Sequence, residues 1–240
     1  TRAFTHRGVR TGLEENTLIA FQRAVDLGVD HLESDVHASA DGTVYLFHDE
    51  TLDRVTTASG RFNDYSDAQL AQVRAGGQPL CTLDMLLDAF PQALLNLDVK
   101  DEHVIGPLAE LIERRQAHGS IALAAFDTRR SAAVAALLSK PVRRSPGQRD
   151  MVLIWLCAHL FGRVPHRLIR DFWAVQVPLK QGIIPVATPR FVRAVQRAGA
   201  QVHVWVANDE PTMRLLAARG VDAIMSDDAE LLVKVLGAQA

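Results

Sequence analysis

The sequence predicts one α/β domain folded as a (β/α)8 barrel, the TIM-barrel architecture, and three observations predict it. Short apolar runs alternate with amphipathic helical windows along the whole 240-residue chain, as expected for strands and helices of a parallel sheet. The count of strand runs is eight, and chains of this length commonly fold as a single α/β barrel. A doubly wound sheet is the alternative, but neither G-x-G-x-x-G nor G-x-x-x-x-G-K-[ST] follows any strand to favour it.

The expected elements follow one another in regular order. Helical windows are expected at residues 17–27, 83–90, 104–118, 131–138, 150–161, 189–198, 211–219 and 229–236, several of them followed by a glycine that ends the helix. Strands are expected at residues 2–5, 29–36, 94–99, 121–125, weakly near Val142, and at 173–177, 202–206 and 222–225. The alternation favours one continuous barrel.

One irregularity follows the second strand. Asp41-Gly42 stands between the runs 35–39 and 43–48, which is a strong hairpin signal. A hairpin centred on these two residues would place His48 opposite Asp35. The polar residues from about 50 to 80 are expected to form a small insertion within the single domain of residues 1–240.

Composition and charge exclude several classes of protein. With 26 Lys+Arg against 28 Asp+Glu the net charge is −2, which gives no field to hold a nucleic acid. Cys81 and Cys157 are far apart without C-x-x-C spacing, so neither a disulfide framework nor a zinc site is expected. Reduced thiols make a cytoplasmic location the default expectation, although Thr1 in place of methionine leaves room for a removed leader. The oligomeric state cannot be read from the sequence.

The most apolar stretch lies at residues 151–161 and is too short to cross a bilayer, which needs about 20 residues. Arginines surround it within residues 141–173. The simpler interpretation is a barrel helix with solvated arginine neighbours. The alternative is a weak contact with an anionic membrane surface, as basic amphipathic segments make.

Polar residues at the expected strand ends are the candidates for chemistry, because active sites of such barrels lie at the carboxyl ends of the strands. The first strand runs into His6 and Arg7, and the second carries Glu33 and Asp35 on one face because side chains alternate with period two. The third strand ends with Asp98 and Lys100, again on one face.

Three carboxylates at one barrel mouth repel each other unless a cation or proton relieves them. A divalent cation with oxygen ligands, Mg²⁺ or Ca²⁺, is the economical solution. His6 and His48 are suited to acid and base work near neutral pH, and Arg7 and Lys100 supply positive charge for an anionic substrate. His37 is either a further ligand or proton shuttle, or an ordinary hairpin histidine.

These motifs together resemble the glycerophosphodiester phosphodiesterase family. The resemblance rests on ordered motifs at His6-Arg7-Gly8, Glu15-Asn16-Thr17, Glu33-x-Asp35, Asp41-Gly42, His48-Asp49, Asn96-Leu97-Asp98-Val99-Lys100, Phe126, Trp205 and residues 220–227. It covers nearly the whole chain apart from residues 140–172.

The resemblance implies an enzyme that binds one divalent cation and cleaves a small-molecule glycerophosphodiester to glycerol 3-phosphate and an alcohol. It implies roles for each motif, namely Glu33, Asp35 and Asp98 as metal ligands, His6 and His48 as the acid/base pair, and Arg7 and Lys100 as phosphate contacts. Phe126 and Trp205, at expected strand ends, are candidates for lining the pocket.

Asp98 departs from the family pattern, which usually has Glu at that position. Sphingomyelinase D-type phospholipases are similar to this family and also have Asp there, so a lysolipid phosphodiesterase is the alternative enzyme. The Glu15-Asn16-Thr17 segment and the insertion after His48 favour the phosphodiesterase. A barrel that binds glycerophosphodiesters without turnover is the alternative of another class.

Overall fold

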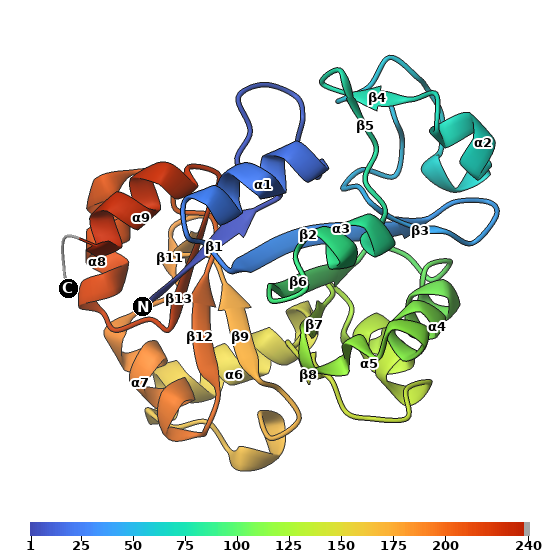
Figure 1. The fold of residues 1–240 in the computed structure, drawn as a ribbon. Coiled ribbons are helices and arrows are strands. Elements are labelled where there is room, and N and C mark those ends of the chain that lie inside the picture. Colours follow the sequence, from blue (N-terminus) through green and yellow to red (C-terminus); the bar gives the residue numbers. More distant parts are fainter. Residues whose placement is uncertain (238–240) are drawn as a thin grey trace.

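The computed structural model describes residues 1–237, and its centre is the predicted barrel of eight parallel strands (Figure 1). Around the barrel the strands follow the order β8, β7, β6, β2, β1, β13, β12, β9. Their bounds are β1 Arg2–His6, β2 His31–Ala38, β6 Leu94–Val99, β7 Ile121–Ala124, β8 Arg143–Arg144, β9 Ala174–Val177, β12 Gln201–Val204 and β13 Ala223–Ser226. A backbone hydrogen bond from Trp173 N to Arg144 O (2.8 Å) links the two ends of this order. The weak strand expected near Val142 is the two-residue β8.

Helices cover the outside of the strands, and all eight predicted helices are present within a few residues of their expected ends (Figure 1). Threonine or aspartate side chains cap several of them; Thr17, for example, accepts a hydrogen bond from Ala20 N at the start of α1. The helices are α1 Leu18–Asp26, α2 Asp67–Leu70, α3 Leu83–Ala89, α4 Ile105–Arg115, α5 Thr128–Ala136, α6 Gln148–Phe161, α7 Pro189–Arg197, α8 Glu210–Ala218 and α9 Ala229–Gly237, with 3-10 turns at Phe62–Asp64, Ala117–Gly119 and His166–Leu168. The four-residue α2 has no counterpart among the predicted helices.

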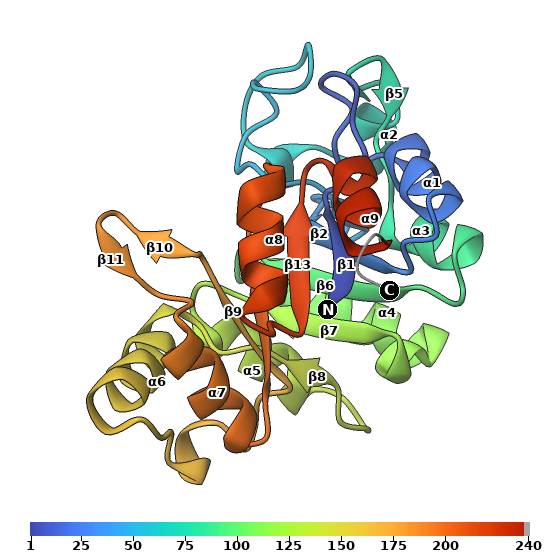
Figure 2. The same cartoon turned by 90° about the vertical axis from the view of Figure 1, so that its left-hand side faces the viewer.

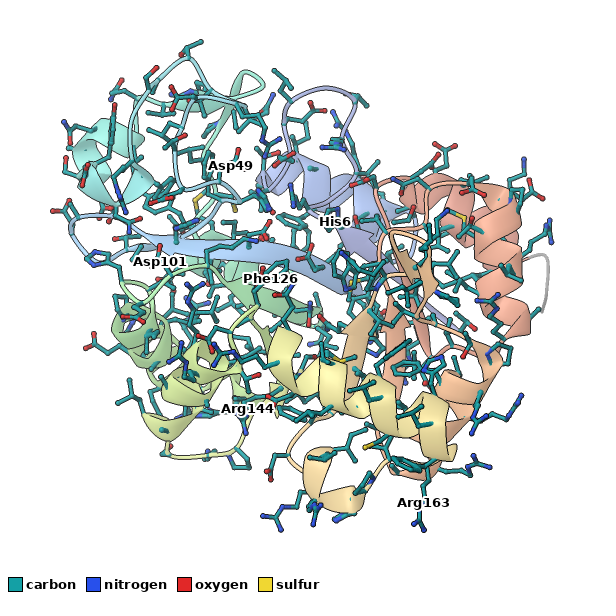
Figure 3. All side chains as sticks on the ribbon, turned by 180° about the vertical axis from the view of Figure 1, so that it is seen from behind. His6, Asp49, Asp101, Phe126, Arg144 and Arg163 are labelled. Carbon is teal, nitrogen blue, oxygen red and sulfur yellow. The ribbon has the colours of Figure 1, made fainter. Side chains whose placement is uncertain are left out.

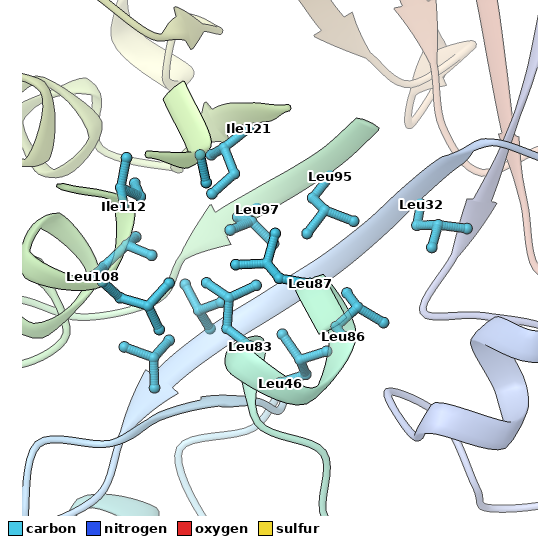
Figure 4. Packing of buried hydrophobic residues seen from close by; sticks show 14 of the residues in the cluster. Leu32, Leu46, Leu83, Leu86, Leu87, Leu95, Leu97, Leu108, Ile112 and Ile121 are labelled. Atoms are coloured by element: carbon cyan, nitrogen blue, oxygen red, sulfur yellow. The ribbon is translucent and has the colours of Figure 1, made fainter. Parts of the chain in front are cut away.

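The main hydrophobic core lies between the strands and these helices. Figure 4 shows Leu32, Leu95 and Leu97 of the strands packed against Leu83 and Leu86 of α3, with side chains of α4 beside them. A second cluster packs the four helices α6, α7, α8 and α9 against the strands β9, β12 and β13. Outward-pointing residues of the strands are therefore apolar, as the burial of helix-covered parallel strands requires.

The inside of the barrel holds polar side chains together with a small apolar cluster of Phe4, Ala223 and Met225, and these inner residues alternate with the apolar outer ones. The ring of Phe4 packs at a tilt against His31 and His203, with ring centroids 4.7 and 5.1 Å apart. One step nearer the carboxyl ends of the strands, Gln176 Nε2 donates to Asn96 Oδ1 (2.8 Å) across the interior. The polar residues at the carboxyl ends of the strands form the next layer above this packed interior.

The hairpin predicted at Asp41-Gly42 is present, but its predicted register is wrong. β2 pairs with β3 (Val44–Leu46) so that Val36 faces Leu46, and Phe47 N donates to Asp35 O (2.9 Å). The cause is a three-residue loop instead of a two-residue one, with Gly42 at φ +87°, a common hairpin alternative. His48 therefore lies one position beyond the residue opposite Asp35.

The predicted insertion after the hairpin has a small apolar core of its own. Tyr45, Phe47, Leu52 and Leu70 surround the fully buried Phe62. The two-residue strands β4 (Arg74–Ala75) and β5 (Gln78–Pro79) pair at its end. Phe62 N donates to Glu50 O (2.9 Å), so this core fixes the chain directly after His48. The assignment of residues 1–240 to one domain stays a prediction.

In the described part of the chain, residues 1–237, every helix is too short or too polar to cross a membrane. The apolar stretch at residues 151–161 forms most of α6, a helix on the outside of the barrel. The cytoplasmic location stays a prediction.

Candidate active site

Three strands bring four of the predicted site residues together at their carboxyl ends. His6 of β1 is paired in register with Glu33 of β2, and Asp35 of β2 with Asp98 of β6. Paired residues on neighbouring parallel strands point to the same face of the sheet. The structure therefore places these four side chains on the inner side of one barrel mouth, as the strand-end rule predicts.

Backbone geometry at the end of β1 explains the His6-Arg7-Gly8 motif. Arg7 and Gly8 have φ of +61° and +81°, and this left-handed conformation turns the chain sharply out of the strand. A Cβ on Gly8 would lie 2.7 Å from Cβ of Ala20 in α1. Only glycine fits there, because α1 packs directly against the turn.

His6 is held by a carboxylate that the sequence interpretation missed. Its Nδ1 lies 2.8 Å from Asp227 Oδ1, which orients the ring so that Nε2 lies 4.0 Å from Glu33 Oε2. Burial lowers the pKa of His6, but the Asp227 hydrogen bond and the Glu33 charge outweigh it, so the pKa is raised. Asp227 directly follows β13, so the strand-end rule alone could have identified it.

Glu33 is the least compensated carboxylate of the site. It is buried, and its Oε2 has no hydrogen-bond partner within the described residues. Burial and the nearby charge of Asp35 raise the pKa of Glu33 to about 8. A proton or a cation would relieve this carboxylate.

Asp35 is surrounded by positive charge. Lys100 Nζ lies 2.8 Å from its Oδ1, and Arg7 Nε lies 3.0 Å from its Oδ2. Burial raises the pKa of Asp35, but these two cations outweigh it, so the pKa is lowered. Lys100 Nζ also lies 2.7 Å from Asp98 Oδ2, so its ammonium group occupies the space between Asp35 and Asp98.

His48 approaches the same mouth from the loop after β3. Its Nδ1 lies 2.5 Å from Asp49 Oδ1, and Asp49 is in turn paired with Arg54. His48 is near enough that its charge contributes to the lowered pKa of Asp35. Figure 3 shows Asp49 on this loop and His6 at the end of β1. Although the predicted register is wrong, the structure does bring His48 to the site.

His37 lies beneath His48 and is buried. Its Nδ1 lies 2.6 Å from Asp101 Oδ2, and its Nε2 lies 3.4 Å from the backbone oxygen of His48. Within the described residues it belongs to no cluster of metal ligands. Its contacts support the backbone at His48, and the roles of ligand or proton shuttle stay predictions.

A buried glutamate gathers the arginines next to the site. Glu15 is 4% exposed and lies 3.2 Å from Arg7, 2.9 Å from Arg10 and 3.1 Å from Arg54. These bonds position Arg7 beside Asp35 and Arg54 beside Asp49. In the sequence, Glu15 stands out only as part of the Glu15-Asn16-Thr17 motif. The spacing of the residues does not reveal that three arginines contact it.

The carboxylates fit a divalent cation in kind. Glu33, Asp35 and Asp98 offer the oxygen ligands that Mg²⁺ and Ca²⁺ prefer, and Glu33 Oε2 is buried without a partner. Within residues 1–237, however, no three His, Cys, Asp or Glu side chains form a ready-made cation site. Instead, the ammonium group of Lys100 bridges Asp35 and Asp98.

The two aromatic pocket candidates lie in different surroundings. Phe126 is 56% exposed, and Lys100 Nζ lies 5.8 Å from its ring centroid, so it stands at the edge of the site. Trp205 is partly buried and packs against Phe4, Ala223 and Met225 inside the barrel. Their contact with a substrate stays a prediction.

Comparison with known proteins identifies the family. Residues 6–231 match the glycerophosphoryl diester phosphodiesterase family. A Mycobacterium tuberculosis protein named "Probable glycerophosphodiester phosphodiesterase 2" is 38% identical over 98% of this chain and 90% of its own length. A Caldanaerobacter subterraneus protein named "Glycerophosphodiester phosphodiesterase" is 24% identical over 98% of each chain.

Solved structures confirm the predicted fold. An Oleispira antarctica phosphodiesterase, solved in complex with sn-glycerol-3-phosphate, superimposes with a TM-score of 0.80 at 23% identity, over 99% of this chain and 97% of that chain. A glycerophosphodiester phosphodiesterase from Agrobacterium tumefaciens gives a TM-score of 0.80 at 22% identity, over 98% of this chain and 99% of that chain. The chain therefore belongs to the glycerophosphoryl diester phosphodiesterase family, as its motifs predict, and is a phosphoric diester hydrolase.

Proposed function

We propose that this protein hydrolyses glycerophosphodiesters to glycerol 3-phosphate and an alcohol, with His6 and His48 as the acid/base pair. The observation that carries the proposal is the pair of carboxylate-held histidines at one barrel mouth, His6 on Asp227 and His48 on Asp49. A carboxylate at Nδ1 fixes the tautomer and leaves Nε2 free for proton transfer. The names of the relatives and the product in the Oleispira structure support the choice of substrate.

The reaction we propose has two steps that use the histidines in opposite senses. In the first step one histidine takes the proton of the free glycerol hydroxyl, which attacks phosphorus, while the other donates a proton to the departing alcohol. In the second step water, deprotonated by one histidine, opens the resulting cyclic phosphate, and the glycerol oxygen recovers its proton from the other. Each histidine thus returns to its starting protonation state.

Arg7 and Lys100 are the proposed contacts for the phosphate oxygens. Both cations lie at the mouth of the barrel. Arg7 is paired with Asp35, and Lys100 is paired with Asp35 and Asp98. An entering phosphodiester is an alternative partner for these cations, because charge-assisted hydrogen bonds to phosphate are strong. Glu15 holds Arg7 from the other side, which limits the movement that this exchange requires.

Glu33, Asp35 and Asp98 are the residues we propose to hold one Mg²⁺ or Ca²⁺ ion. When bound, such an ion supplies positive charge next to the phosphoryl oxygens. Lys100 must then withdraw from between Asp35 and Asp98, which leaves its ammonium group free to contact the substrate. Phe126 is the residue we propose to contact the alcohol portion, because it is largely exposed and lies next to Lys100.

Product analysis tests this function. Purified protein is incubated with the glycerophosphodiesters of choline, ethanolamine, glycerol and inositol and, separately, with a lysolipid such as lysophosphatidylcholine, and the phosphorus-containing products are identified by ³¹P NMR. Glycerol 3-phosphate is the expected product. A cyclic lipid phosphate formed only from lysolipids would instead support the sphingomyelinase D-type enzyme, and binding without any product would support the non-catalytic barrel.

A further inference from the structure

The outer face of α6 is apolar where a barrel helix normally meets water. Val152, Leu153, Leu156, Leu160 and Phe161 are between 38% and 69% exposed. Of the helix only Ile154 and Ala158 are fully covered by the barrel. Isolated exposed apolar residues are ordinary, but a contiguous group on one helix marks an interaction surface.

A short hairpin extends this face. The strands β10 (Lys180–Gln181) and β11 (Ile184–Pro185) project from the barrel on the same side as α6 (Figure 2). Ile183 at the hairpin tip is 99% exposed, and Trp155 Nε1 of α6 donates to Pro185 O (3.4 Å). We call the five exposed α6 residues together with Ile183 the apolar surface.

Arginines surround the apolar surface. Residues 141–197 contain ten Lys or Arg and only two Asp or Glu, although the whole chain carries a net charge of −2. Arg149 is exposed near the start of α6, and Arg163 lies just beyond its end (Figure 3). Arg190 and Arg197 donate to the backbone oxygens of Leu160 and Gly162, which fixes two further positive charges at that end.

Within the described residues, carboxylates neutralise almost none of these charges. Of the basic residues in 141–197, only Arg170 has a carboxylate partner among the described residues, Asp171 at 3.8 Å. A partner that covers this surface must therefore offer both apolar material and negative charge. A nucleic-acid backbone offers the charge but leaves the apolar side chains in water, and a second copy in a twofold contact brings the same positive surface against itself.

We propose that the apolar surface and its arginines dock the protein on an anionic lipid bilayer. Apolar side chains enter the acyl boundary while the surrounding arginines contact lipid phosphates, as in interfacial amphipathic helices. The hairpin follows the carboxyl end of β9, which is the end of the barrel that carries His6, Glu33 and Asp35. Docking therefore keeps the mouth of the barrel next to the lipid surface.

Vesicle co-sedimentation of the full chain tests the proposal without substrate, so its outcome does not depend on hydrolysis. Wild-type protein is expected to sediment with phosphatidylcholine vesicles that contain phosphatidylglycerol, and to stay in the supernatant with phosphatidylcholine alone or at high salt. A variant with Leu153→Gln, Leu160→Gln and Ile183→Gln is expected to partition about tenfold more weakly. Arg163→Gln with Arg167→Gln is expected to remove most of the preference for anionic vesicles.

Matched controls come from other faces of the barrel. Met85 and Leu215 are 41% and 42% exposed on α3 and α8, so Met85→Gln with Leu215→Gln removes apolar surface elsewhere and is expected to bind like wild type. Arg114→Gln, an exposed arginine on α4, serves as the charge control. Equal recovery of wild type with neutral and anionic vesicles overturns the proposal, and so does a wild-type dimer in analytical ultracentrifugation that the triple variant dissociates.

Discussion

His6 and His48 reach the site from different elements, yet each ring is bonded at Nδ1 to a carboxylate, Asp227 or Asp49. The two carboxylates differ in setting. Asp227 is also bonded by Asn208 (2.7 Å) and lies 3.6 Å from Arg10, whereas Asp49 lies 2.5 Å from Arg54. Each carboxylate is therefore shared between a histidine and an arginine, and the arginine is closer to Asp49 than to Asp227.

Asp227→Asn is expected to lower the pKa of His6 and slow turnover. The hydrogen bond to Asp227 is the main group that raises this pKa against burial, and an amide offers no negative charge in its place. Turnover is expected to fall about 10- to 100-fold, with the acidic limb of the pH profile displaced if His6 titrates in it. NMR titration of the His6 ring measures the pKa directly, and an unchanged pKa would contradict this role of Asp227.

Lys100→Gln is expected to tighten cation binding while it weakens activity. The substitution removes the ammonium group that bridges Asp35 and Asp98 and leaves their charges for a divalent ion. Isothermal titration with Mg²⁺ and with Ca²⁺ is expected to show about tenfold stronger binding than in wild type. Cation binding that is unchanged or weaker would contradict the proposed ligand set.

The sequence predicts His6, Glu33, Asp35 and Asp98 because each stands at the end of an identifiable strand. It does not reveal how their charges are compensated. Glu15, buried under Arg7, Arg10 and Arg54, has no periodic signal, since its partners converge only after the β1–α1 loop and the insertion have folded.

At the scale of elements, the turn after β1 and the β2–β3 hairpin set the site geometry. The hairpin was predicted from Asp41-Gly42, but the loop has three residues rather than two, so pairing is displaced by one position. A displacement of one residue changes which side chains face the core. Local turn chemistry favours both loop lengths, so the register depends on packing in the folded chain, where Leu46 joins the main core and Tyr45 the core of the insertion.

Gly8→Ala is expected to destabilise the fold far more than Gly28→Ala. Both glycines have nearly the same φ, +81° and +82°. A Cβ at Gly8 would lie 2.7 Å from Cβ of Ala20, whereas a Cβ at Gly28 would have no neighbouring atom within 4 Å. The conformational cost is about 1 kcal/mol at either position, and overpacking brings the total at Gly8 to about 3 kcal/mol. Urea unfolding of both variants measures the difference, and equal losses would show that α1 yields to the new side chain.

At the scale of the whole molecule, the barrel buries a neutral histidine that takes no part in the proposed chemistry. His203 of β12 is fully buried between Phe4 and Trp173. Burial, with the nearby charges of His31 and Arg2, lowers its pKa to about 3. The alternation of strands and helices predicts the barrel, but it does not predict which interior positions hold polar residues, because that depends on contacts between distant strands.

Stability is therefore expected to fall as the pH drops below 6.5. The unfolded chain takes up a proton at His203 near that pH while the folded chain does not, so the free energy of unfolding decreases by up to about 1.4 kcal/mol per pH unit. Between pH 7 and pH 5 this amounts to about 2 kcal/mol. Urea unfolding at pH 7 and pH 5 measures this effect. Between these two pH values, His203→Gln is expected to lose about 2 kcal/mol less stability than wild type. The control His166→Gln, at an exposed histidine, is expected to follow wild type. Parallel curves for wild type and His203→Gln would contradict the buried neutral histidine.

The most direct measurement of the central claim is glycerol 3-phosphate release from a panel of glycerophosphodiesters with added Mg²⁺ or Ca²⁺, repeated after chelation and with His48→Ala. We predict release by wild type that depends on the cation and falls at least about 100-fold in the variant, while circular dichroism shows the fold retained. Release by His48→Ala at a rate near that of wild type would contradict the proposed role of this histidine, and release unaffected by chelation would contradict the proposed cation.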